Sequence, residues 1–327
     1  MIDLMSLEPT QVNKDLRGKY ILIYGAPKIG KTTLANSFEK NLLLAFEPGY
    51  NALNNAYVVP VTKWSEFKKV LKQLEQPAIK EKFHTITIDT ADLCWDACEK
   101  YICASNINEA TGETPKALGD IPWGKGYDLC KKEFDTALRQ IAMLGYGLVI
   151  ISHETTKNIK TESGEEYQKI MPTLAERPKL IVNRLVDIIA YLRLSTEDGK
   201  RYIYTRGNEK FEAGSRFPLL QPKIEMSYQN LVDELYTAIE EQAKQDNVAL
   251  SSTNSNSFFK KGREFSEVIE EARNVFTQLI DKDKEKNAVL TNEILLKVFG
   301  KPMKLSEATE SQQELVEVVL EEWKALL

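Results

Sequence analysis

The sequence has few cysteines and few histidines, four and two in 327 residues. So few cysteines do not make the disulfide framework of a small secreted protein. Cys94, Cys98 and Cys103 lie close together, with Cys130 further along, but they form no Cys-x-x-Cys pair and no histidine adjoins them. Because Cys94 and Cys98 have the spacing of one helix face, we expect the thiols to pack in the core rather than to bind zinc.

The chain also lacks long apolar runs and an excess of basic residues. No run of about 18 apolar residues is present, so we expect no membrane span. Residues 1–11 lack the charged and apolar regions of a secretory signal, so we expect a cytoplasmic protein. The formal net charge is −5. Any nucleic-acid binding must therefore come from local loops rather than from a basic surface as a whole.

Apolar segments typical of buried strands alternate with segments typical of helices. Strands are expected at 20–24, 41–47, 83–90, 146–154 and 187–194, and helices at 31–40, 64–75, 91–103 and 125–143. This alternation predicts an α/β fold with a mainly parallel sheet covered by helices on both faces. Asp198-Gly199 then predicts a hairpin turn, and 227–244 a closing helix.

The remaining C-terminal sequence predicts a separate small helical module. The segment 251–263 is rich in Ser and Asn, which is typical of a linker. We therefore expect an N-terminal extension at 1–17, a core at 18–250, and the module at 264–327. The module has one apolar stripe, Val268, Ala272, Val275, Phe276 and Leu279, and a second, Leu315, Val318, Val319, Trp323 and Leu326, with Gly300-Lys301-Pro302 ending the helix between them. Its eight Lys/Arg and fourteen Asp/Glu give a net charge of −6, which leaves +1 for the rest of the chain.

Residues 25–32, which follow the first expected strand, fit the phosphate-binding pattern G-x-x-x-x-G-K-[ST]. We call this segment the P-loop. Its glycines allow a tight turn whose backbone N–H groups point at phosphate oxygens, and the following helix presents its positive end. Lys31 is expected at the β- and γ-phosphates, and the Thr32 hydroxyl on Mg²⁺. The expected nucleotide-binding residues are Gly25, Ala26, Pro27, Lys28, Ile29, Gly30, Lys31, Thr32 and Thr33.

Polar residues end three further strands of the expected sheet. Asp89 follows an apolar strand in the manner of a Walker B motif, which predicts a second ligand for Mg²⁺, although such a residue can also cap the next helix. Glu47 ends the strand after the P-loop helix and is our candidate for the base that activates water. Ser152 or His153 is expected to sense the γ-phosphate from the fourth strand. Together with Glu154, these residues should gather around one γ-phosphate where the strands end.

This order of parts resembles the RecA-like recombinase core. More narrowly, the chain resembles the phage-encoded P-loop ATPases of the Sak type, which are single-strand annealing proteins often described as AAA-type phage nucleotide-binding proteins. The resemblance covers about residues 18–240 and rests on the segments 24–35, 46–53, 86–90, 119–127, 150–154 and 211–220. It implies a RecA-like ATPase that uses ATP and Mg²⁺ in the host cytoplasm, binds single-stranded DNA and supports annealing or recombination.

The resemblance also implies where DNA and neighbouring subunits bind. By position, the loops 104–126 and 154–178 would approach single-stranded DNA. The first has Lys116, Trp123, Lys125 and Tyr127, a mixture suited to backbone contact and base stacking; the second has Lys157, Lys160 and Lys169 among several glutamates, which also suits a solvated surface. RecA-like subunits bind ATP at a subunit boundary, so we expect a homo-oligomer in which Arg216 or Lys210, close to Arg206, acts in trans.

Several alternatives remain open from the sequence. The acidic module either recruits a partner, such as a single-strand-binding or replication protein, or packs on the core. The protein could instead be a nucleotide-gated oligomeric binding module, or an ATPase of the helicase or helicase-loader type. A small-molecule kinase is a further alternative, although no compact Arg-rich lid is visible in the sequence.

Overall fold

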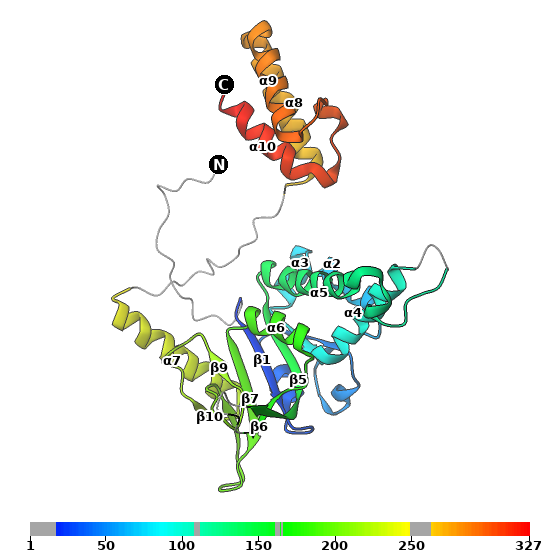
Figure 1. The fold of residues 1–327 in the computed structure, drawn as a ribbon. Helices are drawn as coiled ribbons and strands as arrows, with labels where there is room; N and C mark the ends of the chain where they lie inside the picture. Colours follow the sequence, from blue (N-terminus) through cyan, green and yellow to red (C-terminus); the bar gives the residue numbers. More distant parts are fainter. Residues whose placement is uncertain (1–17, 108–111, 161–163, 165, 249–262) are drawn as a thin grey trace. The chain divides into compact units, whose positions relative to one another are not determined.

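The computed structural model describes residues 18–107, 112–160, 164, 166–248 and 263–327. Within these residues the chain forms two compact units, one over 18–248 and one over 263–327 (Figure 1). The expected N-terminal extension, 1–17, and all but the last residue of the expected linker, 251–263, lie outside the described residues.

The larger unit is built on a ten-stranded mixed sheet. Eight strands follow the order β10-β8-β7-β1-β5-β4-β2-β3, while β6 pairs with β5 and β9 pairs with β7 beside this path. The strands are β1 (Tyr20–Gly25), β2 (Asn41–Ala45), β3 (Tyr57–Pro60), β4 (Thr85–Asp89), β5 (Gly147–Lys160), β6 (Glu166–Pro172), β7 (Ile188–Leu194), β8 (Arg201–Tyr204), β9 (Gly214–Ser215) and β10 (Lys223–Glu225). The neighbours from β3 through β2, β4, β5 and β1 to β7 all pair in parallel, whereas β8, β9 and β10 pair antiparallel at one edge.

Helices cover both faces of the parallel strands, as the sequence predicted (Figure 1). The helices of this unit are α1 (Lys31–Asn36), α2 (Trp64–Leu74), α3 (Pro77–Lys82), α4 (Ala91–Ser105), α5 (Lys125–Met143), α6 (Glu176–Leu185) and α7 (Tyr228–Asp246). Alternate residues of a strand face opposite sides of a sheet. Leu22 therefore packs with α2, α4, α5 and α6, while Ile21 and Ile23 pack with α1 and α7. The four cysteines lie buried in the first of these cores, as expected.

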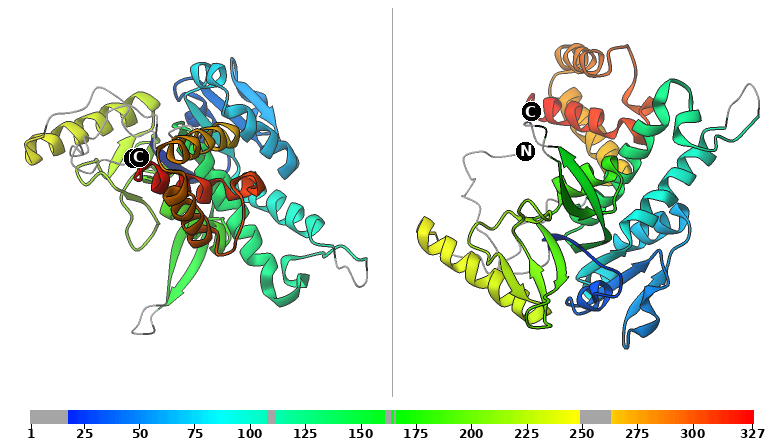
Figure 2. Two further views of the ribbon diagram at one scale, coloured as in Figure 1. Left: turned by 90° about the horizontal axis from the view of Figure 1, so that it is seen from above. Right: turned by 60° about the horizontal axis from the view of Figure 1, so that its bottom comes forward.

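Strands β5 and β6 form a β-hairpin within 154–178, so the prediction of a loop there was wrong, while the predicted approach to DNA stays a prediction. Strand β5 does not end at the polar residues 152–154 but continues to Lys160, and it pairs antiparallel with β6 from Glu154↔Pro172 to Lys160↔Glu166. The left view of Figure 2 shows this green hairpin projecting from the sheet. Its outer residues are polar and exposed, so they lack the apolar run by which buried strands are recognised.

Two smaller differences concern the start of the sheet. Strand β3 was not predicted, because it is a four-residue edge strand that ends in Pro60. The expected helix 31–40 is shorter, since α1 ends at Asn36.

The predicted turn at Asp198-Gly199 is present. It joins β7 to β8 in an antiparallel pair, with Leu194 opposite Arg201, and Gly199 has φ 70°.

The smaller unit contains α8 (Phe265–Lys282), α9 (Lys284–Phe299) and α10 (Gln313–Lys324) around its own apolar core. Helix α9 ends at Gly300, which adopts φ 70°, as the Gly-Lys-Pro sequence predicted. The second predicted stripe was partly wrong: Leu315 and Val318 are exposed, and the buried face of α10 is formed by Val316, Val319, Leu320 and Trp323. Over the described part of the chain, no helix is long and apolar enough to span a membrane.

Candidate functional site

The carboxyl ends of four parallel strands bring the predicted site residues together. Strands β1, β5, β4 and β2 are consecutive neighbours in the sheet. Gly25 ends β1, His153 lies opposite it on β5, and Asp89 ends β4. Glu47 follows β2, and its backbone N–H donates to the Asp89 carbonyl at 3.3 Å. One cluster thus forms at the edge where ligands bind open α/β sheets.

The P-loop is held close to the neighbouring strand by its first glycine. A Cβ added to Gly25 would lie 2.5 Å from the carbonyl oxygen of Leu192 on β7, so no larger residue fits there. The Lys31 side chain is buried and folds back over the loop, with Nζ donating to the Gly25 and Ala26 carbonyl oxygens at 3.0 Å each. Nζ is also 3.3 Å from Nδ1 of His153. Lys31 therefore lies at the centre of the loop, where a phosphate would meet it.

Three oxygen-bearing side chains converge beside this lysine. The Thr32 hydroxyl donates to Oδ2 of Asp89 at 2.7 Å. A Cβ built on Gly49 would lie 3.6 Å from Oε1 of Glu47, 3.8 Å from Oγ1 of Thr32 and 3.9 Å from Oδ2 of Asp89, so all three oxygens face the space beside this glycine. Oxygen ligands of this kind suit Mg²⁺. Oδ1 of Asp89 is buried and has no hydrogen-bond partner among the described residues, so the carboxylate keeps an unsatisfied acceptor in this cluster. The residues present therefore fit ATP with Mg²⁺.

Burial acts on both charged groups of this cluster. Burial raises the pKa of Asp89, although the hydrogen bond from Thr32 opposes that shift. Burial also lowers the pKa of Lys31, and the nearby Asp89 and Glu47 carboxylates oppose it. In both residues the protein environment disfavours the charged form, which is common where groups are placed for function rather than for stability.

His153 joins the cluster, whereas Ser152 does not. Nε2 of His153 is 3.4 Å from Oε2 of Glu47, so this ring lies between the lysine and the candidate base. Successive residues of a strand point to opposite faces. The Ser152 hydroxyl is buried on the other face and donates to Oδ2 of Asp92 at 2.9 Å, while Thr173 donates to Oδ1 of Asp92 at 2.8 Å. Of the two residues predicted to sense the phosphate, the structure brings only His153 to the P-loop.

Arg216 lies at the opposite end of the strands. Its Nη1 is 3.0 Å from Oδ1 of Asp187, and Oδ2 of the same carboxylate accepts a hydrogen bond from the backbone of Tyr20 at 2.9 Å. Tyr20 begins β1 and the P-loop follows the end of that strand, roughly 17 Å away at the usual rise per residue. Arg216 therefore does not contribute to the site of its own chain, and its role in trans stays a prediction.

Three residues near the P-loop, Gly49, Arg201 and Met226, were missed by the sequence analysis. A Cβ on Gly30 would lie 3.4 Å from Nη1 of Arg201 and 3.1 Å from Cε of Met226, so these side chains cover the outside of the loop. Arg201 begins β8 and comes close only because β8 pairs with β7 beside β1. No local pattern predicts that contact. Gly49, by contrast, directly follows Glu47-Pro48, and its smallness was a usable signal.

A comparison with protein families decides the classification. Residues 17–217 match the model of a family described as "AAA domain". The chain belongs to this AAA-domain family. It is accordingly a nucleotide-binding P-loop ATPase with an α/β fold, which confirms the predicted fold class. The P-loop, Asp89 and Glu47 all lie within the residues that match the AAA domain.

The AAA-domain protein also resembles individual proteins along most of its length. It is 27% identical over 346 residues to "SPbeta prophage-derived uncharacterized protein YorG" of Bacillus subtilis (strain 168), covering 100% of this chain and 99% of that protein. Among solved structures, that of the RadB recombinase matches with a TM-score of 0.36 and 14% identity, covering 65% of this chain and 90% of the other.

Proposed function

We propose that the protein hydrolyses ATP with Mg²⁺ and couples this to binding of single-stranded DNA. One observation supports the hydrolytic site above all: Lys31, the Thr32–Asp89 hydrogen bond of 2.7 Å, and Glu47 meet at one sheet edge. This arrangement supplies a cation for phosphate, oxygen ligands for a metal, and a carboxylate for water.

Each residue has a distinct task in this proposal. The Lys31 ammonium exchanges its bonds to the loop carbonyls for bonds to the β- and γ-phosphates. Thr32 and Asp89 would hold Mg²⁺, which would neutralise charge on the phosphate oxygens. Glu47 orients the attacking water and accepts its proton. His153 contacts both Lys31 and Glu47, so it responds when either side chain moves.

The β5–β6 hairpin supports the DNA-binding part of the proposal. Lys157 lies directly opposite Lys169 in the ladder, and Tyr167 lies two residues away on the same face. Two like charges in this position destabilise a hairpin. At the tip, in contrast, Lys160 forms an ion pair of 3.0 Å with Glu166. An anionic ligand such as a DNA backbone would relieve the repulsion between Lys157 and Lys169, and the tyrosine could stack on a base.

Trp123 supports the other predicted DNA segment, 104–126. Its side chain is 92% exposed, and its backbone has φ 64°, which is rare for a bulky residue. A large aromatic side chain held in solvent at a strained position is suited to base stacking. Tyr127 is less available than the sequence suggested, because the Arg177 guanidinium covers its ring at 4.0 Å.

The biological setting belongs to the same proposal. The similarity to a prophage-derived protein favours a phage protein that works in the host cytoplasm. We propose a homo-oligomer of the Sak type in annealing or recombination, with a residue such as Arg216 or Lys210 acting at the neighbouring subunit's ATP, and with 264–327 contacting a single-strand-binding or replication protein.

One observation favours a second candidate, a nucleotide-gated binding module that includes helicase-loader types. Strand β5 carries His153 at the nucleotide site and Lys157 on the hairpin, only four residues apart. Binding of ATP could therefore reposition the hairpin without rapid turnover.

The test is ATP hydrolysis by the full-length protein with and without an oligo-dT strand. Glu47→Gln is expected to lower kcat by about 10²- to 10⁴-fold while ATP binding persists. Trp123→Ala is expected to keep the basal rate but to lose the stimulation by DNA, since it leaves the phosphate site intact.

Each alternative has its own outcome in this assay. If Glu47→Gln hydrolysed ATP at the wild-type rate, Glu47 would not be the base. ATP-dependent assembly with negligible hydrolysis would favour the gated module. If DNA did not change the rate of hydrolysis by the wild type, and Trp123→Ala had the same rates, neither of the two predicted segments would bind DNA.

A further inference from the structure

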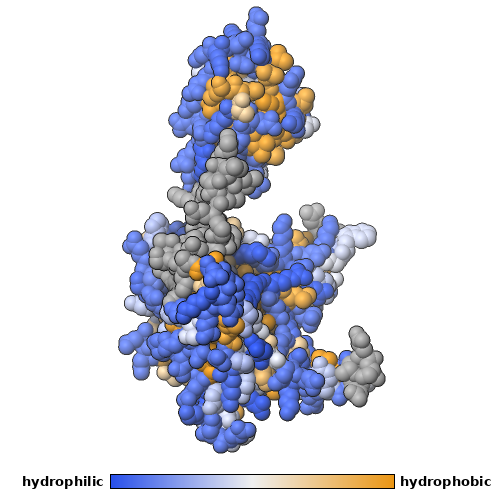
Figure 3. All heavy atoms as spheres, turned by 90° about the vertical axis from the view of Figure 1, so that its left-hand side faces the viewer, coloured by the Kyte–Doolittle hydropathy of each residue, from blue (hydrophilic) through white to orange (hydrophobic). Residues whose placement is uncertain are grey.

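The unit 263–327 carries a groove that the ATPase site does not use. Figure 3 shows hydrophobic residues gathered on one face of this unit. Three large apolar side chains that line the groove, Val289, Leu296 and Phe276, are 57%, 48% and 38% exposed. Exposed apolar side chains that gather in one place are typical of an interaction site.

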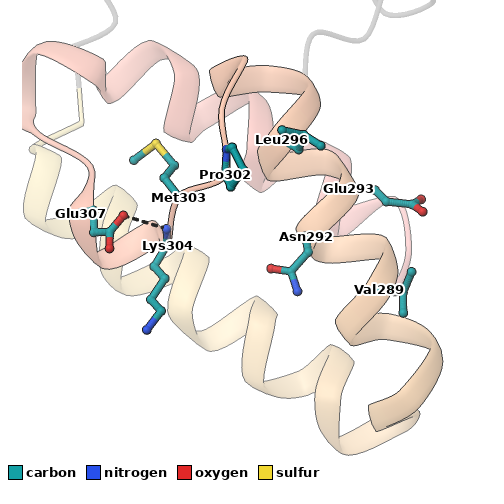
Figure 4. Close-up of a pocket in the computed structure, with 8 residues that line it drawn as sticks. All are labelled: Val289, Asn292, Glu293, Leu296, Pro302, Met303, Lys304 and Glu307. Carbon is teal, nitrogen blue, oxygen red and sulfur yellow. Dashed lines mark hydrogen bonds between the residues drawn. The ribbon is translucent and has the colours of Figure 1, made fainter.

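The first part of the groove is apolar. Figure 4 shows it between α9 and the segment that follows Gly300, with a cavity volume of about 640 Å³. Val289, Leu296, Pro302 and Met303 contribute its apolar surface. Glu293 and Glu307 also line it, and the Glu307 carboxylate accepts a hydrogen bond from the Lys304 backbone at 3.1 Å.

The second part of the groove is basic. It has a volume of about 540 Å³, and Arg273 and Lys304 line it together with Phe276, Leu295, Leu305 and Trp323. No acidic residue lines it, although the module as a whole has fourteen acidic residues and eight basic ones. Asn292 and Lys304 line both parts, which makes them one continuous surface. We call this surface the α9 groove.

The charges of the α9 groove are available to a ligand. Lys297 and Lys324 lie 3.3 and 2.9 Å from Glu322 and Glu271. Arg273 and Lys304, by contrast, form no ion pair with any residue that the structure describes. The buried indole N–H of Trp323 likewise has no hydrogen-bond partner in the described part of the chain. The basic part therefore offers the side-chain donors of Arg273 and Lys304 to a ligand that can accept hydrogen bonds.

We propose that the α9 groove binds an acidic peptide segment of a partner protein. A carboxylate of the peptide lies between Arg273 and Lys304, and an adjacent apolar side chain packs against Val289, Leu296 and Met303. Two linked cavities suit an extended chain better than a compact metabolite. Glu293 and Glu307 line only the apolar part, whereas no acidic residue lines the basic part, so the carboxylate of the peptide is directed to Arg273 and Lys304.

The experiment selects binders from a random dodecapeptide library on the immobilised full-length protein. Enriched peptides are expected to combine Asp or Glu with a neighbouring large apolar residue. In fluorescence polarisation, Arg273→Ala and Lys304→Ala are each expected to weaken binding of the best peptide about tenfold. Lys301→Ala is the matched control, because Lys301 is exposed beside the groove but lines neither part.

Changes to the peptide provide a test that does not depend on the variants folding. Replacing its Asp or Glu residues by Asn or Gln should weaken binding to the wild-type protein about tenfold, and replacing its apolar residue by Ser should do the same. Enrichment of basic peptides, no enrichment at all, or equal binding to Arg273→Ala and Lys304→Ala would overturn the proposal. ATP hydrolysis is read separately, so neither result bears on the proposed ATPase.

Discussion

At the scale of single residues, the site contains two charges that burial opposes. Asp89 and Lys31 are 2% and 6% exposed, and the pKa of each is shifted towards the neutral form. The hydrogen bond from Thr32 fixes the orientation of Asp89 but does not remove the cost of burying its charge. A group that is retained in spite of this cost is expected to serve binding rather than stability.

Asp89→Asn should therefore stabilise the nucleotide-free protein and weaken metal binding. Folding raises the pKa of Asp89 above its ordinary value of 3.8, so the folded chain binds this proton more readily than the unfolded one. The free energy of unfolding of the wild type thus falls as pH rises from 3.8 through the raised pKa. The advantage of the variant should grow over that range and persist at pH 7, as urea titrations would measure.

The same variant should lower Mg²⁺-dependent nucleotide affinity about 10- to 100-fold. Asp96→Asn, an exposed change on α4, is the control and should alter neither property. If Asp89→Asn destabilised the protein at pH 7, the attraction of Asp89 for Lys31 would outweigh its burial, contrary to this account.

The sequence predicted these residues because their spacing relative to strands is local. Lys31, Thr32, Asp89 and Glu47 each follow an apolar strand, and parallel strands end at one edge. Arg201 and Met226 were missed, since their contacts depend on how edge strands return to the loop, whereas Gly49 was missed in spite of a local signal beside Glu47. The sequence placed Ser152 and His153 at the end of a strand. Which of the two side chains points to the P-loop depends on the face of the sheet, and that follows only from the register of the strands.

At the scale of elements, the β5–β6 hairpin is the largest difference between sequence and structure. The buried part of β5 was recognised by its apolar run, but Thr155–Lys160 has a single apolar residue, Ile159, and its side chains are exposed or half-buried. Such a strand is specified by its partner rather than by burial. The same exposure leaves its side chains free to serve binding.

Lys169→Glu should change hairpin stability and DNA binding in opposite directions. It places an acid opposite Lys157, so local stability should rise by roughly 0.2–1 kcal/mol, which hydrogen exchange of the hairpin amides would measure. Affinity for oligo-dT should fall, and the slope of log K against log salt should become shallower by about 0.7 for each phosphate that the protein no longer neutralises.

Lys72→Glu on α2 is the matched control for that prediction, because it changes the net charge equally at an exposed position away from the hairpin. An equal loss of DNA affinity in this control would mean that only the overall charge matters. Unchanged affinity in Lys169→Glu would place the DNA elsewhere.

At the scale of the whole molecule, each described unit has its own core. The buried residues of α8, α9 and α10 cluster only with one another, and those of the sheet and its helices form separate clusters. The acidic charge is also divided unevenly, with −6 on residues 264–327 and +1 on the rest. Small units bury a smaller fraction of their surface than large ones, so the helical unit should be the less stable of the two.

The full-length protein should consequently unfold in two steps rather than one. Calorimetry should resolve a small transition for the helical unit and a larger one for the sheet. A protein that ends at residue 250 should lose the small transition, keep the large one, and bind ATP with an affinity within about twofold of the wild type, because the P-loop, Asp89 and Glu47 all lie in the sheet unit. A single transition that shifts as a whole when 251–327 is removed would instead show that the two units stabilise each other, and the acidic unit would then act on the ATPase directly rather than only through a partner.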